Sequence, residues 1–335
     1  MKAIVYEKYG SPDVLELKEV EKPIPKDNEV LVKVHAASVN DWDWGLLRGK
    51  PFMNRLVVSG LLKPKIKILG GDIAGWVEAI GRNIKQFQPG DEVFGDLSGY
   101  GFSGFAEYVC ARENALVLKP ASMTFEEAAA IPQAAVLALQ GLRDKGKMQP
   151  GQKVLINGAG GGAGTFAVQI AKSFGAEVTG VDSTRKLDIM RSIGADHVID
   201  YTQEDFTKNG QRYDWILDFA GYHSIVDYNR ALSPKGIYVM VGGSAATFLQ
   251  TLFLGPLFSM TTGKKIGLLM HKPNKDLAFM KELFEASKVK PVIDKRYPLS
   301  EVPEALRYFG KGHNRGKVVI TVKNNDKPNN LGVHS

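Results

Sequence analysis

The sequence predicts an α/β protein of two domains, one a barrel-like β domain and the other a doubly wound parallel sheet. Three observations predict this fold class. The length of 335 residues corresponds to about two domains of ordinary size. Short β-rich runs punctuated by glycine and proline fill the chain before residue 122, and strands alternate with helices from residue 153 onward.

The composition is that of an ordinary globular protein, with 44% apolar and 24% charged residues, which excludes disorder. The single cysteine, Cys110, excludes a disulfide scaffold and a multi-thiolate metal site. A net charge of +7 favours anionic partners such as phosphates, but it is too dispersed to indicate nucleic acid. The apolar stretch 248–258 is shorter than the ~20 residues of a membrane span, and the N-terminus lacks a signal peptide's apolar core. We therefore expect a cytoplasmic protein.

The first third of the chain is expected to form strands, because no long helical period precedes residue 120. Its strand-like runs are 30–36, 92–94 and 105–109. Thr124 and Glu127 then form the pattern of a capping box, which predicts the start of a helix. Pro132 predicts a kink or a restart of that helix.

Strands and helices alternate in the middle of the chain, which predicts the parallel sheet. The expected strands are 153–157, 177–181, 197–200, 213–218 and 236–241, with 265–270 as a candidate last strand. The expected helices are 165–174, 185–193 and 223–232. After residue 273 we expect helices at 275–287 and 301–309, strands at 291–293 and 317–321, and a disordered tail over 326–335.

A glycine-rich turn is the strongest functional signal, because it follows a strand directly and opens a helix. Glycines let the backbone turn sharply and approach a pyrophosphate, and the helix start offers free N–H groups to the anion. Asp182 ends the next strand at the spacing of a dinucleotide-binding fold. The alternative is a flexible loop that binds nothing. The expected cofactor-binding residues of the turn are Ala159, Gly160, Gly161, Gly162, Ala163 and Gly164.

The residues after this strand leave the choice between NADP(H) and NAD(H) open. Asp182 suits the ribose hydroxyl groups of NAD and would repel a 2′-phosphate. Ser183, Arg185 and Lys186 supply hydrogen-bond donors and positive charge that suit the phosphate, although the two basic residues also fit a solvated helix start. We favour NADP(H) slightly.

The whole chain over about residues 1–322 resembles the medium-chain dehydrogenase/reductase superfamily, in its zinc-independent quinone oxidoreductase-like branch. The residues that carry the resemblance, besides the glycine turn, are Val39, Asn40 and Asp43; Gly71, Asp72, Gly75 and Gly81; the run 89–93; the run 104–108; Gly194, Asp196, Asp200 and Tyr201; Gly242 and Gly243; and Gly316 and Lys317.

The resemblance implies a discontinuous GroES-like β-barrel catalytic domain over 1–121 and 273–325. It implies an inserted Rossmann domain over 122–272, with the active cleft at the junction. It places Tyr201, Lys186 and Lys317 near cofactor phosphate, Gly242 and Gly243 beside the nicotinamide, and Asn40 in the substrate cleft. Two departures from the family pattern are Asp41, where this branch usually has proline, and Leu137, where many relatives have threonine.

A zinc site is not expected. The zinc-dependent relatives use a cysteine near residue 40 and a Gly-His-Glu motif, whereas this chain has Asn40 and the pair Gly71 and Asp72. The six histidines do not cluster.

We therefore expect hydride transfer from the nicotinamide to a quinone or an activated alkene, an enone or enal, with a small apolar substrate. Without a metal, a hydrogen-bond donor has to stabilise the developing oxyanion, and Asn40 is our candidate, although it also suits a loop cap. Asp43 is expected to orient the site as an acceptor. Tyr100 is a candidate late proton donor, with solvent as the alternative.

Two other functions stay open. One is a metal-free carbonyl or alcohol oxidoreductase. The other is a cofactor-binding interaction or RNA-binding protein of the crystallin type, although no RNA-reading motif is found. The apolar stretch 248–258 is expected to cap a substrate pocket, form a subunit interface or simply fill the core. The similar stretch 51–69, which contains Phe52, Met53 and Leu56, is expected to form the facing wall of the pocket or a lid. The resemblance implies a homodimer that pairs through the edge strand 265–270.

Overall fold

The computed structural model describes residues 1–52 and 55–322, which form two compact units. The first unit consists of residues 1–133, 273–285 and 293–322. The second consists of residues 134–272 and 286–292. Met53 and the predicted tail 326–335 lie outside the described residues.

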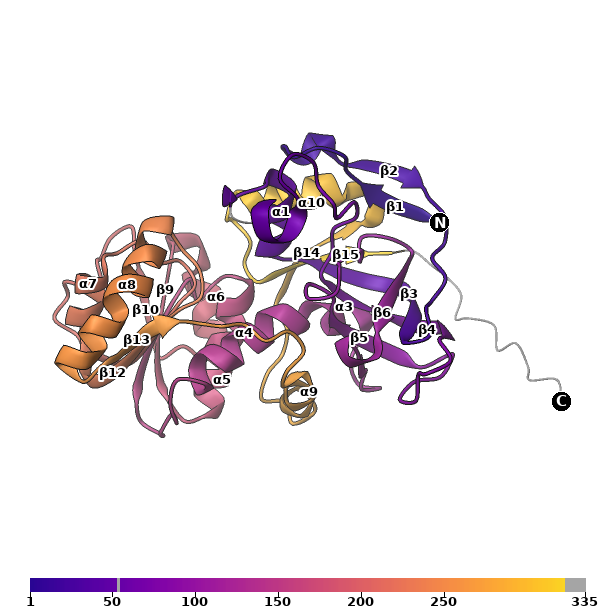
Figure 1. The fold of residues 1–335 in the computed structure, drawn as a ribbon. Coiled ribbons are helices and arrows are strands. Elements are labelled where there is room, and N and C mark those ends of the chain that lie inside the picture. Colours follow the sequence, from indigo (N-terminus) through magenta and orange to yellow (C-terminus); the bar gives the residue numbers. More distant parts are fainter. Residues whose placement is uncertain (53–54, 323–335) are drawn as a thin grey trace. The chain divides into compact units, whose positions relative to one another are not determined.

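A seven-stranded, mainly antiparallel sheet forms the body of the first unit (Figure 1). Its strand order is β14-β15-β3-β4-β5-β7, and β6 also pairs with β3. The short strands β1 and β2 form a separate antiparallel ladder. The strands of the unit are β1 (Lys2–Val5), β2 (Glu16–Glu19), β3 (Glu29–Val39), β4 (Asp72–Ile80), β5 (Glu92–Asp96), β6 (Tyr108–Arg112), β7 (Val117–Leu118), β14 (Ile293–Pro298) and β15 (Lys317–Thr321).

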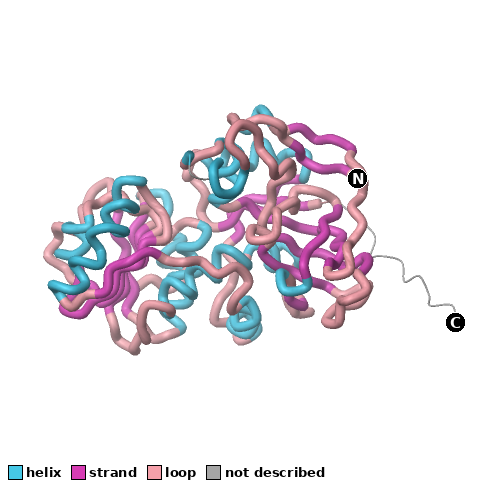
Figure 2. Tube along the Cα trace, viewed as in Figure 1, coloured by secondary structure: helices cyan, strands magenta, loops and turns pink. Residues whose placement is uncertain are grey.

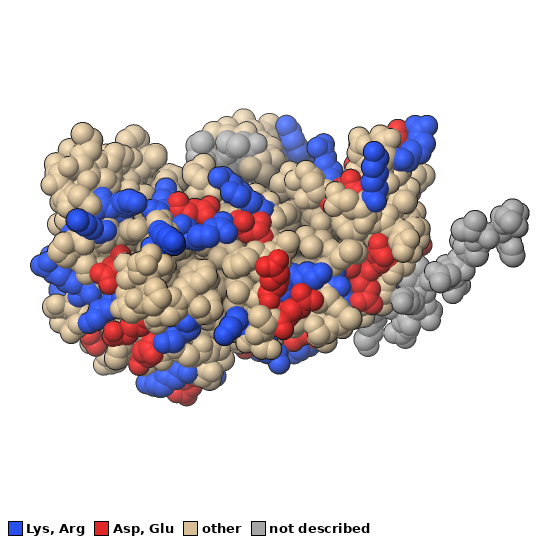
Figure 3. All heavy atoms as spheres, turned by 90° about the horizontal axis from the view of Figure 1, so that it is seen from below, with Lys and Arg blue, Asp and Glu red and all other residues tan. Residues whose placement is uncertain are grey.

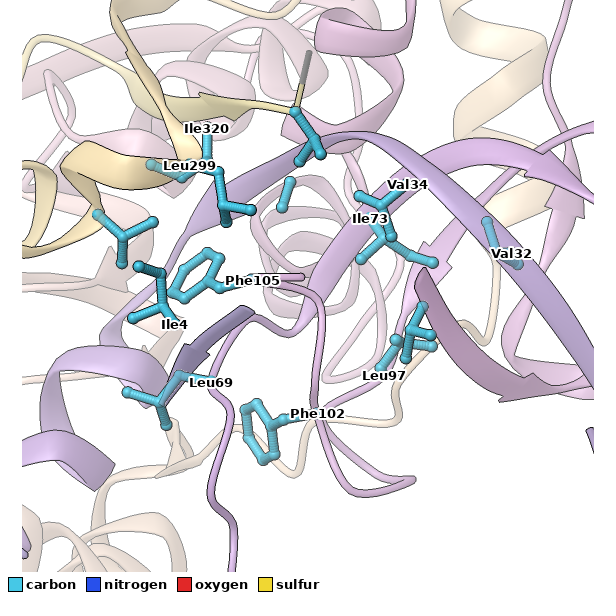
Figure 4. Packing of buried hydrophobic residues seen from close by; sticks show 14 of the residues in the cluster. Ile4, Val32, Val34, Leu69, Ile73, Leu97, Phe102, Phe105, Leu299 and Ile320 are labelled. Atoms are coloured by element: carbon cyan, nitrogen blue, oxygen red, sulfur yellow. The ribbon is translucent and has the colours of Figure 1, made fainter. Parts of the chain in front are cut away.

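The core of this unit forms because alternate residues of β3 point inward. Val32 and Val34 are fully buried and belong to one cluster with Ile73 of β4 (Figure 4). Phe105 lies next to Ile4 in the same cluster, and the Ile4 N–H donates to the Phe105 carbonyl at 2.9 Å. The first strand is thereby tied to the sheet that carries the polar cluster described below.

The α-helices among the described residues of the first unit are α1 (Asp41–Arg48), α3 (Phe125–Ala130), α9 (Leu277–Glu285) and α10 (Val302–Gly310), and a short π-helix covers Arg55–Ser59. The predicted capping box is confirmed, because the Thr124 hydroxyl accepts from the Glu127 N–H at 3.2 Å and α3 begins directly after it. Helix α1 was not expected. It spans eight residues, between the N-cap Asn40 and Gly49 at φ 59°, and is too short to show a clear helical period in the sequence.

The second unit is built on a six-stranded parallel sheet, and the predicted doubly wound fold class is confirmed. The order β10-β9-β8-β11-β12-β13 is the 3-2-1-4-5-6 order of dinucleotide-binding folds. The strands lie between helices on both sides (Figure 2). They are β8 (Lys153–Asn157), β9 (Glu177–Asp182), β10 (His197–Asp200), β11 (Tyr213–Asp218), β12 (Leu232–Met240) and β13 (Lys265–Leu268).

The helices of this unit are α4 (Pro132–Arg143, which begins at the end of the first unit), α5 (Gly162–Ser173), α6 (Leu187–Ser192), α7 (Ile225–Ala231) and α8 (Ala245–Thr262). Pro132 starts α4, in agreement with the predicted restart. The apolar stretch 248–258 lies within α8. None of the helices in the described part of the chain combines the length and apolarity that crossing a bilayer requires.

Helix α8 is oriented with its large apolar side chains outward. Thr247, Thr251 and Gly255 are its buried residues. Phe253 and Leu257 are 71% and 58% exposed. Plain core packing, one of the three roles expected for this stretch, therefore does not describe these outward residues.

Candidate functional site

The glycine-rich turn joins β8 to α5 at the carboxyl edge of the parallel sheet. Gly158 has φ +83°, and a Cβ on Gly164 would lie 2.7 Å from the Ala159 Cα, so both positions require glycine. A Cβ on Gly161, the N-cap of α5, would meet only one carbonyl oxygen, at 3.3 Å. The first N–H groups of α5 have no earlier helical carbonyl to bond, and they form a site that suits an anion.

Asp182 is turned back onto this glycine turn. Its Oδ2 accepts from the Gly160 N–H at 3.0 Å, and its Oδ1 accepts from the Ser183 N–H at 2.8 Å. The Lys186 ammonium lies 3.5 Å from Oδ1, and both side chains of this pair are nearly buried. The carboxylate is therefore engaged within the protein, and it fixes the conformation of the turn.

Three further predicted cofactor residues, Ser183, Arg185 and Tyr201, follow the ends of β9 and β10. The two strands pair with Asp200 opposite Asp182, and the Tyr201 N–H donates to the Asp182 carbonyl at 3.2 Å. The Tyr201 side chain is 60% exposed, the Arg185 side chain is exposed and Ser183 is half-buried. Hydrogen-bond donors and one positive charge are thus accessible beside the buried Asp182.

The predicted nicotinamide glycines form a second close backbone contact in the same unit. The Gly221 N–H donates to the Gly242 carbonyl at 3.0 Å. Gly243 has φ +139°, and a Cβ there would lie 2.6 Å from the Gly221 Cα. Side chains at this position would separate the loops that follow β11 and β12.

Asp218 is a buried residue of this edge that the sequence analysis missed. Its Oδ1 accepts from the Asn157 amide at 2.8 Å and from the Ala220 N–H at 3.1 Å, and its Oδ2 accepts from the Tyr238 hydroxyl at 2.9 Å. Burial raises its pKa above the ordinary range. It joins the end of β8, where the glycine turn starts, to β11 and β12.

A polar cluster in the first unit brings together Asn40, Asp72 and Lys317, which come from three separate segments of the chain. The Asn40 amide nitrogen donates to Asp72 Oδ2 at 2.9 Å, and the Lys317 ammonium donates to the Asn40 amide oxygen. The distance from Lys317 Nζ to Asp72 Oδ2 is 3.7 Å. The Asp72 and Lys317 side chains are 0% and 2% exposed, and Asn40 is 6% exposed.

The strand register explains how this cluster forms. Val318 pairs with Val39, so Lys317 at the start of β15 lies beside Asn40 at the end of β3. Ser38 and Asp72 pair across β3 and β4, and Asp72 pairs with Asp96 across β4 and β5. Burial raises the pKa of the Asp72 carboxyl and lowers that of Lys317, while their mutual attraction opposes both shifts.

Asp43 lies in the first turn of α1 and accepts two backbone hydrogen bonds. One comes from the Asn40 N–H at 2.9 Å and the other from the Gly70 N–H at 2.8 Å. Its side chain is fully buried. It therefore holds the segment before β4 against the start of α1.

Tyr100 packs against the core of the first unit, and the Arg112 guanidinium lies 5.9 Å from the centre of its ring. The structure thus gathers Asn40, Asp43 and Lys317, whereas Tyr100 belongs to the loop after β5. Lys317, which the resemblance assigns to cofactor phosphate, is directed at Asn40. Asp72 was missed as a site residue, although it stood in a recognised motif, because nothing in the sequence shows which residues it faces.

Among the described residues, no group of three or more histidine, cysteine, aspartate or glutamate side chains is arranged to hold a metal ion. Cys110 is a free thiol that is half-buried. Desolvation by burial raises its pKa to about 11.

Comparisons with known proteins match most of the chain. A model of the alcohol dehydrogenase GroES-like domain matches residues 26–121, and a model named zinc-binding dehydrogenase matches residues 193–320. The chain is 33% identical to the chloroplast envelope quinone oxidoreductase homolog of Arabidopsis thaliana, over 96% of this chain and 98% of that one. It is also 33% identical to the NADPH-dependent alkenal/one oxidoreductase of the same plant, over 96% and 79%. The solved quinone oxidoreductase of Coxiella burnetii is 30% identical, with a TM-score of 0.84 over 96% and 99% of the two chains.

The buried position of Asp43 generates a prediction for stability against pH. Burial raises the pKa of Asp43 to about 7, against the opposing attraction of Lys317 and in the presence of the negative Asp96. The folded state therefore keeps a proton between about pH 4 and pH 7 that the unfolded state has lost. The contribution of Asp43 to stability is therefore fully present at the acid end of this window and is lost as the pH rises through it.

We expect Asp43→Asn to lower the free energy of unfolding by about 1–3 kcal/mol, because its NH₂ group has to face a backbone N–H. Since asparagine does not titrate, the loss relative to wild type should be larger at pH 5 than at pH 8, by on the order of a few kcal/mol. Urea unfolding at both pH values measures it. The exposed Asp188→Asn variant serves as the control. Equal losses for Asp43→Asn at pH 5 and pH 8 would contradict the raised pKa.

Proposed function

Because the chain belongs to the medium-chain dehydrogenase/reductase superfamily, in its quinone oxidoreductase-like branch, we propose that it is an NAD(P)H-dependent enzyme that reduces a quinone or an activated alkene, an enone or enal. The observation that carries the proposal is the turn between β8 and α5 at the carboxyl edge of a 3-2-1-4-5-6 parallel sheet. The names of the Arabidopsis relatives support the two substrate classes.

The residues of the second unit fit a dinucleotide. Glycine at position 164 lets the start of α5 pack closely against the turn. The unpaired N–H groups at the start of α5 can then donate hydrogen bonds to a diphosphate. Gly242 and Gly243 leave the loop after β12 without side chains, where the resemblance places the nicotinamide. When bound, the reduced nicotinamide supplies the hydride.

NADPH is our proposed cofactor in preference to NADH. Asp182, the residue that would favour NADH, has both carboxylate oxygens occupied by backbone N–H groups and faces the Lys186 ammonium. It is therefore poorly placed to accept from ribose hydroxyls. Arg185 and Tyr201 offer accessible donors beside it, which suits a 2′-phosphate.

In the first unit, Asn40 is the residue that we propose to stabilise negative charge on the substrate oxygen. One amide hydrogen is engaged by Asp72, and the second is available for another acceptor. Asp43 positions Asn40 by accepting a hydrogen bond from the Asn40 backbone N–H.

The proton that completes the reduction is proposed to come from Tyr100 or from water. Since Asp43 is buried and bonded to two backbone donors, we assign it no proton transfer.

We propose that the reaction proceeds without zinc. Asn40 stands where zinc-dependent relatives have a cysteine, and the pair Gly71 and Asp72 replaces their His-Glu, so that glycine takes the place of the histidine. Asn40 and Asp72 are hydrogen-bonded to one another. An amide and a carboxylate that satisfy each other in this way are a poor start for a tetrahedral zinc site. Activity that is unchanged by EDTA is the expected outcome.

The alternative functions make different predictions for the surface and the substrate. Figure 3 shows acidic and basic side chains interspersed on the face that it displays, which gives no support to a nucleic-acid surface. A carbonyl or alcohol oxidoreductase would oxidise simple alcohols with the oxidised cofactor, and the same assay detects that reaction.

The purified protein is expected to oxidise NADPH in the presence of quinones, enones or enals, with and without EDTA. Asn40→Ala should lower kcat/KM by about tenfold or more on every accepted enone, because it removes a hydrogen bond worth about 1.5 kcal/mol in the transition state. The exposed Asn83→Ala variant is the control. If Asn40→Ala turns over all accepted substrates at the wild-type kcat/KM, Asn40 has no part in the mechanism.

Arg185→Ala is expected to lower kcat/KM for NADPH by about tenfold and to leave kcat/KM for NADH within a factor of two. The lost contact is a charge-assisted hydrogen bond to a phosphate that only NADPH carries. Arg191→Ala removes an exposed arginine from the next helix and is the matched control. Equal losses with both cofactors, or a tenfold preference of the wild-type enzyme for NADH, would argue against NADPH.

We also propose that the protein is a homodimer that pairs through the second unit. Strand β13 lies at the end of the sheet order, so one of its edges pairs with no other strand of this sheet, and on that edge the Ile266 N–H donates to the Ser259 hydroxyl at 3.1 Å. Helix α8 packs closely on β13, since a Cβ on Gly255 would lie 3.1 Å from the Ile266 carbonyl oxygen, and it exposes Phe253 and Leu257. A second copy would cover both features. Cytoplasmic location stays a prediction, because the relatives include mitochondrial and chloroplastic proteins.

Light scattering of the wild-type protein at micromolar concentration is expected to give the mass of a dimer. The double substitution Phe253→Glu/Leu257→Glu should shift the mass to that of a monomer, because two charges would be buried without partners. Ile24→Glu replaces an 87% exposed apolar residue of the first unit and is the control. A wild-type monomer, or a dimer that survives the double substitution, would rule out this interface.

A further inference from the structure

The orientation of the Asn40 side-chain amide is set by charge, because the two ends of an amide have nearly the same shape. Its oxygen accepts from the Lys317 ammonium, and its nitrogen donates to Asp72 Oδ2 at 2.9 Å. An ammonium only donates and a carboxylate only accepts. The flipped amide would therefore place NH₂ against NH₃⁺ and the oxygen against a carboxylate.

Both charged partners are themselves held by the backbone. Asp72 accepts from the Gln133 N–H at 3.1 and 3.3 Å and from the Ser38 hydroxyl at 3.3 Å. Lys317 donates a second bond to the Val39 carbonyl at 3.3 Å. Val39 and Ser38 lie on β3, and Gln133 lies at the start of α4, so the partners come from regular secondary structure.

The two charges form an ion pair, but a long one. The distance of 3.7 Å from Lys317 Nζ to Asp72 Oδ2 is longer than the hydrogen bond that each makes with Asn40. The ammonium form of Lys317 is favoured by Asp72, Asp43, Asp41 and Asp96, which face it, while burial lowers its pKa. The side chain of Asn40 is thus the bridge between a buried cation and a buried anion.

We propose that Lys317 and Asp72 are positioning residues that lock the Asn40 amide with its nitrogen as the donor, leaving the second Nδ2 hydrogen to the substrate oxygen. This inference rests on the proposed function, in which Asn40 touches the substrate. It gives Lys317 a role on the substrate side of the reaction in place of the contact with cofactor phosphate that the family resemblance implies.

The experiment is a mutant cycle with NADPH and an enone that the wild-type enzyme accepts. The paired variant Lys317→Met/Asp72→Asn removes both charges together, so that neither is left buried without its partner. We expect its kcat to fall about as far as that of Asn40→Ala, about tenfold or more, while KM for NADPH stays within a factor of two. In the Asn40→Ala background the same pair should cost less than a further factor of two.

Two further variants separate positioning from folding. The single variant Lys317→Arg keeps a cation that only donates. Its kcat should therefore stay close to the wild-type value, unlike that of Lys317→Met/Asp72→Asn. The matched control is Lys119→Met/Glu92→Gln, which removes another ion pair of the first unit with a buried lysine, 2.8 Å between its charged atoms, and should leave kcat unchanged. Should Lys317→Met/Asp72→Asn fail to fold, Lys317→Gln takes its place in the cycle.

If Asn40→Ala and Lys317→Met/Asp72→Asn lower kcat independently, so that their factors multiply in the combined variant, the proposal is overturned. A raised KM for NADPH with kcat unchanged would overturn it as well. A measurement that does not depend on enzyme activity tests the orientation of Asn40 separately from the proposed function. In protein with ¹⁵N-labelled asparagine, the Asn40 side-chain hydrogen bonded to Asp72 should exchange slowly, and the paired variant should speed that exchange at least tenfold. Slow exchange in an enzyme that reduces no quinone or enone would refute the proposed function and leave the lock intact. Equal exchange rates in the wild-type protein and in the paired variant would refute the positioning role of Lys317 and Asp72.

Discussion

Carboxylates that are removed from water in this protein are held by the backbone N–H groups of loops or of a helix start, and the geometry of both units depends on that constraint. Asp182 accepts from Gly160, Asp72 from Gln133, and Asp43 from Gly70. A buried carboxylate without donors would be costly, and a buried N–H without an acceptor would cost about 1–3 kcal/mol. Each bond therefore fixes a loop conformation that the local sequence alone would leave loose.

Two of these carboxylates also face a lysine. Asp182 faces Lys186, and Asp72 faces Lys317 across the Asn40 amide. In both cases the side chains are almost completely buried, so screening by solvent is weak. Removing one member of such a pair leaves the other uncompensated, and removing both is far less disruptive. The charges serve to specify one arrangement of neighbouring groups more than to add stability.

Much of the fold could be predicted, because its signals are local. The strand and helix alternation after residue 153, the glycine turn and the capping box at Thr124 each depend on residues that are close in the sequence. Helix α1 could not be recognised, since eight residues cover little more than two turns and Gly45 interrupts the pattern. The contact between Lys317 and Asn40 joins residues 277 positions apart, and only the register of β15 on β3 brings them together.

Helix α8 and Asp182 show two different limits of a sequence pattern. The apolar run in α8 gives the composition of a buried helix, but the small residues Thr247, Thr251 and Gly255 face the sheet and the large ones face outward. Composition cannot tell these two orientations apart when nearly every residue is apolar. Asp182 stands where a ribose-binding acid is expected, yet its two oxygens already accept from Gly160 and Ser183. Each carboxylate oxygen can accept more than one hydrogen bond, so what remains for a ribose depends on how the backbone surrounds the acid. The path of the glycine turn decides this, and the spacing of the motif does not record that path.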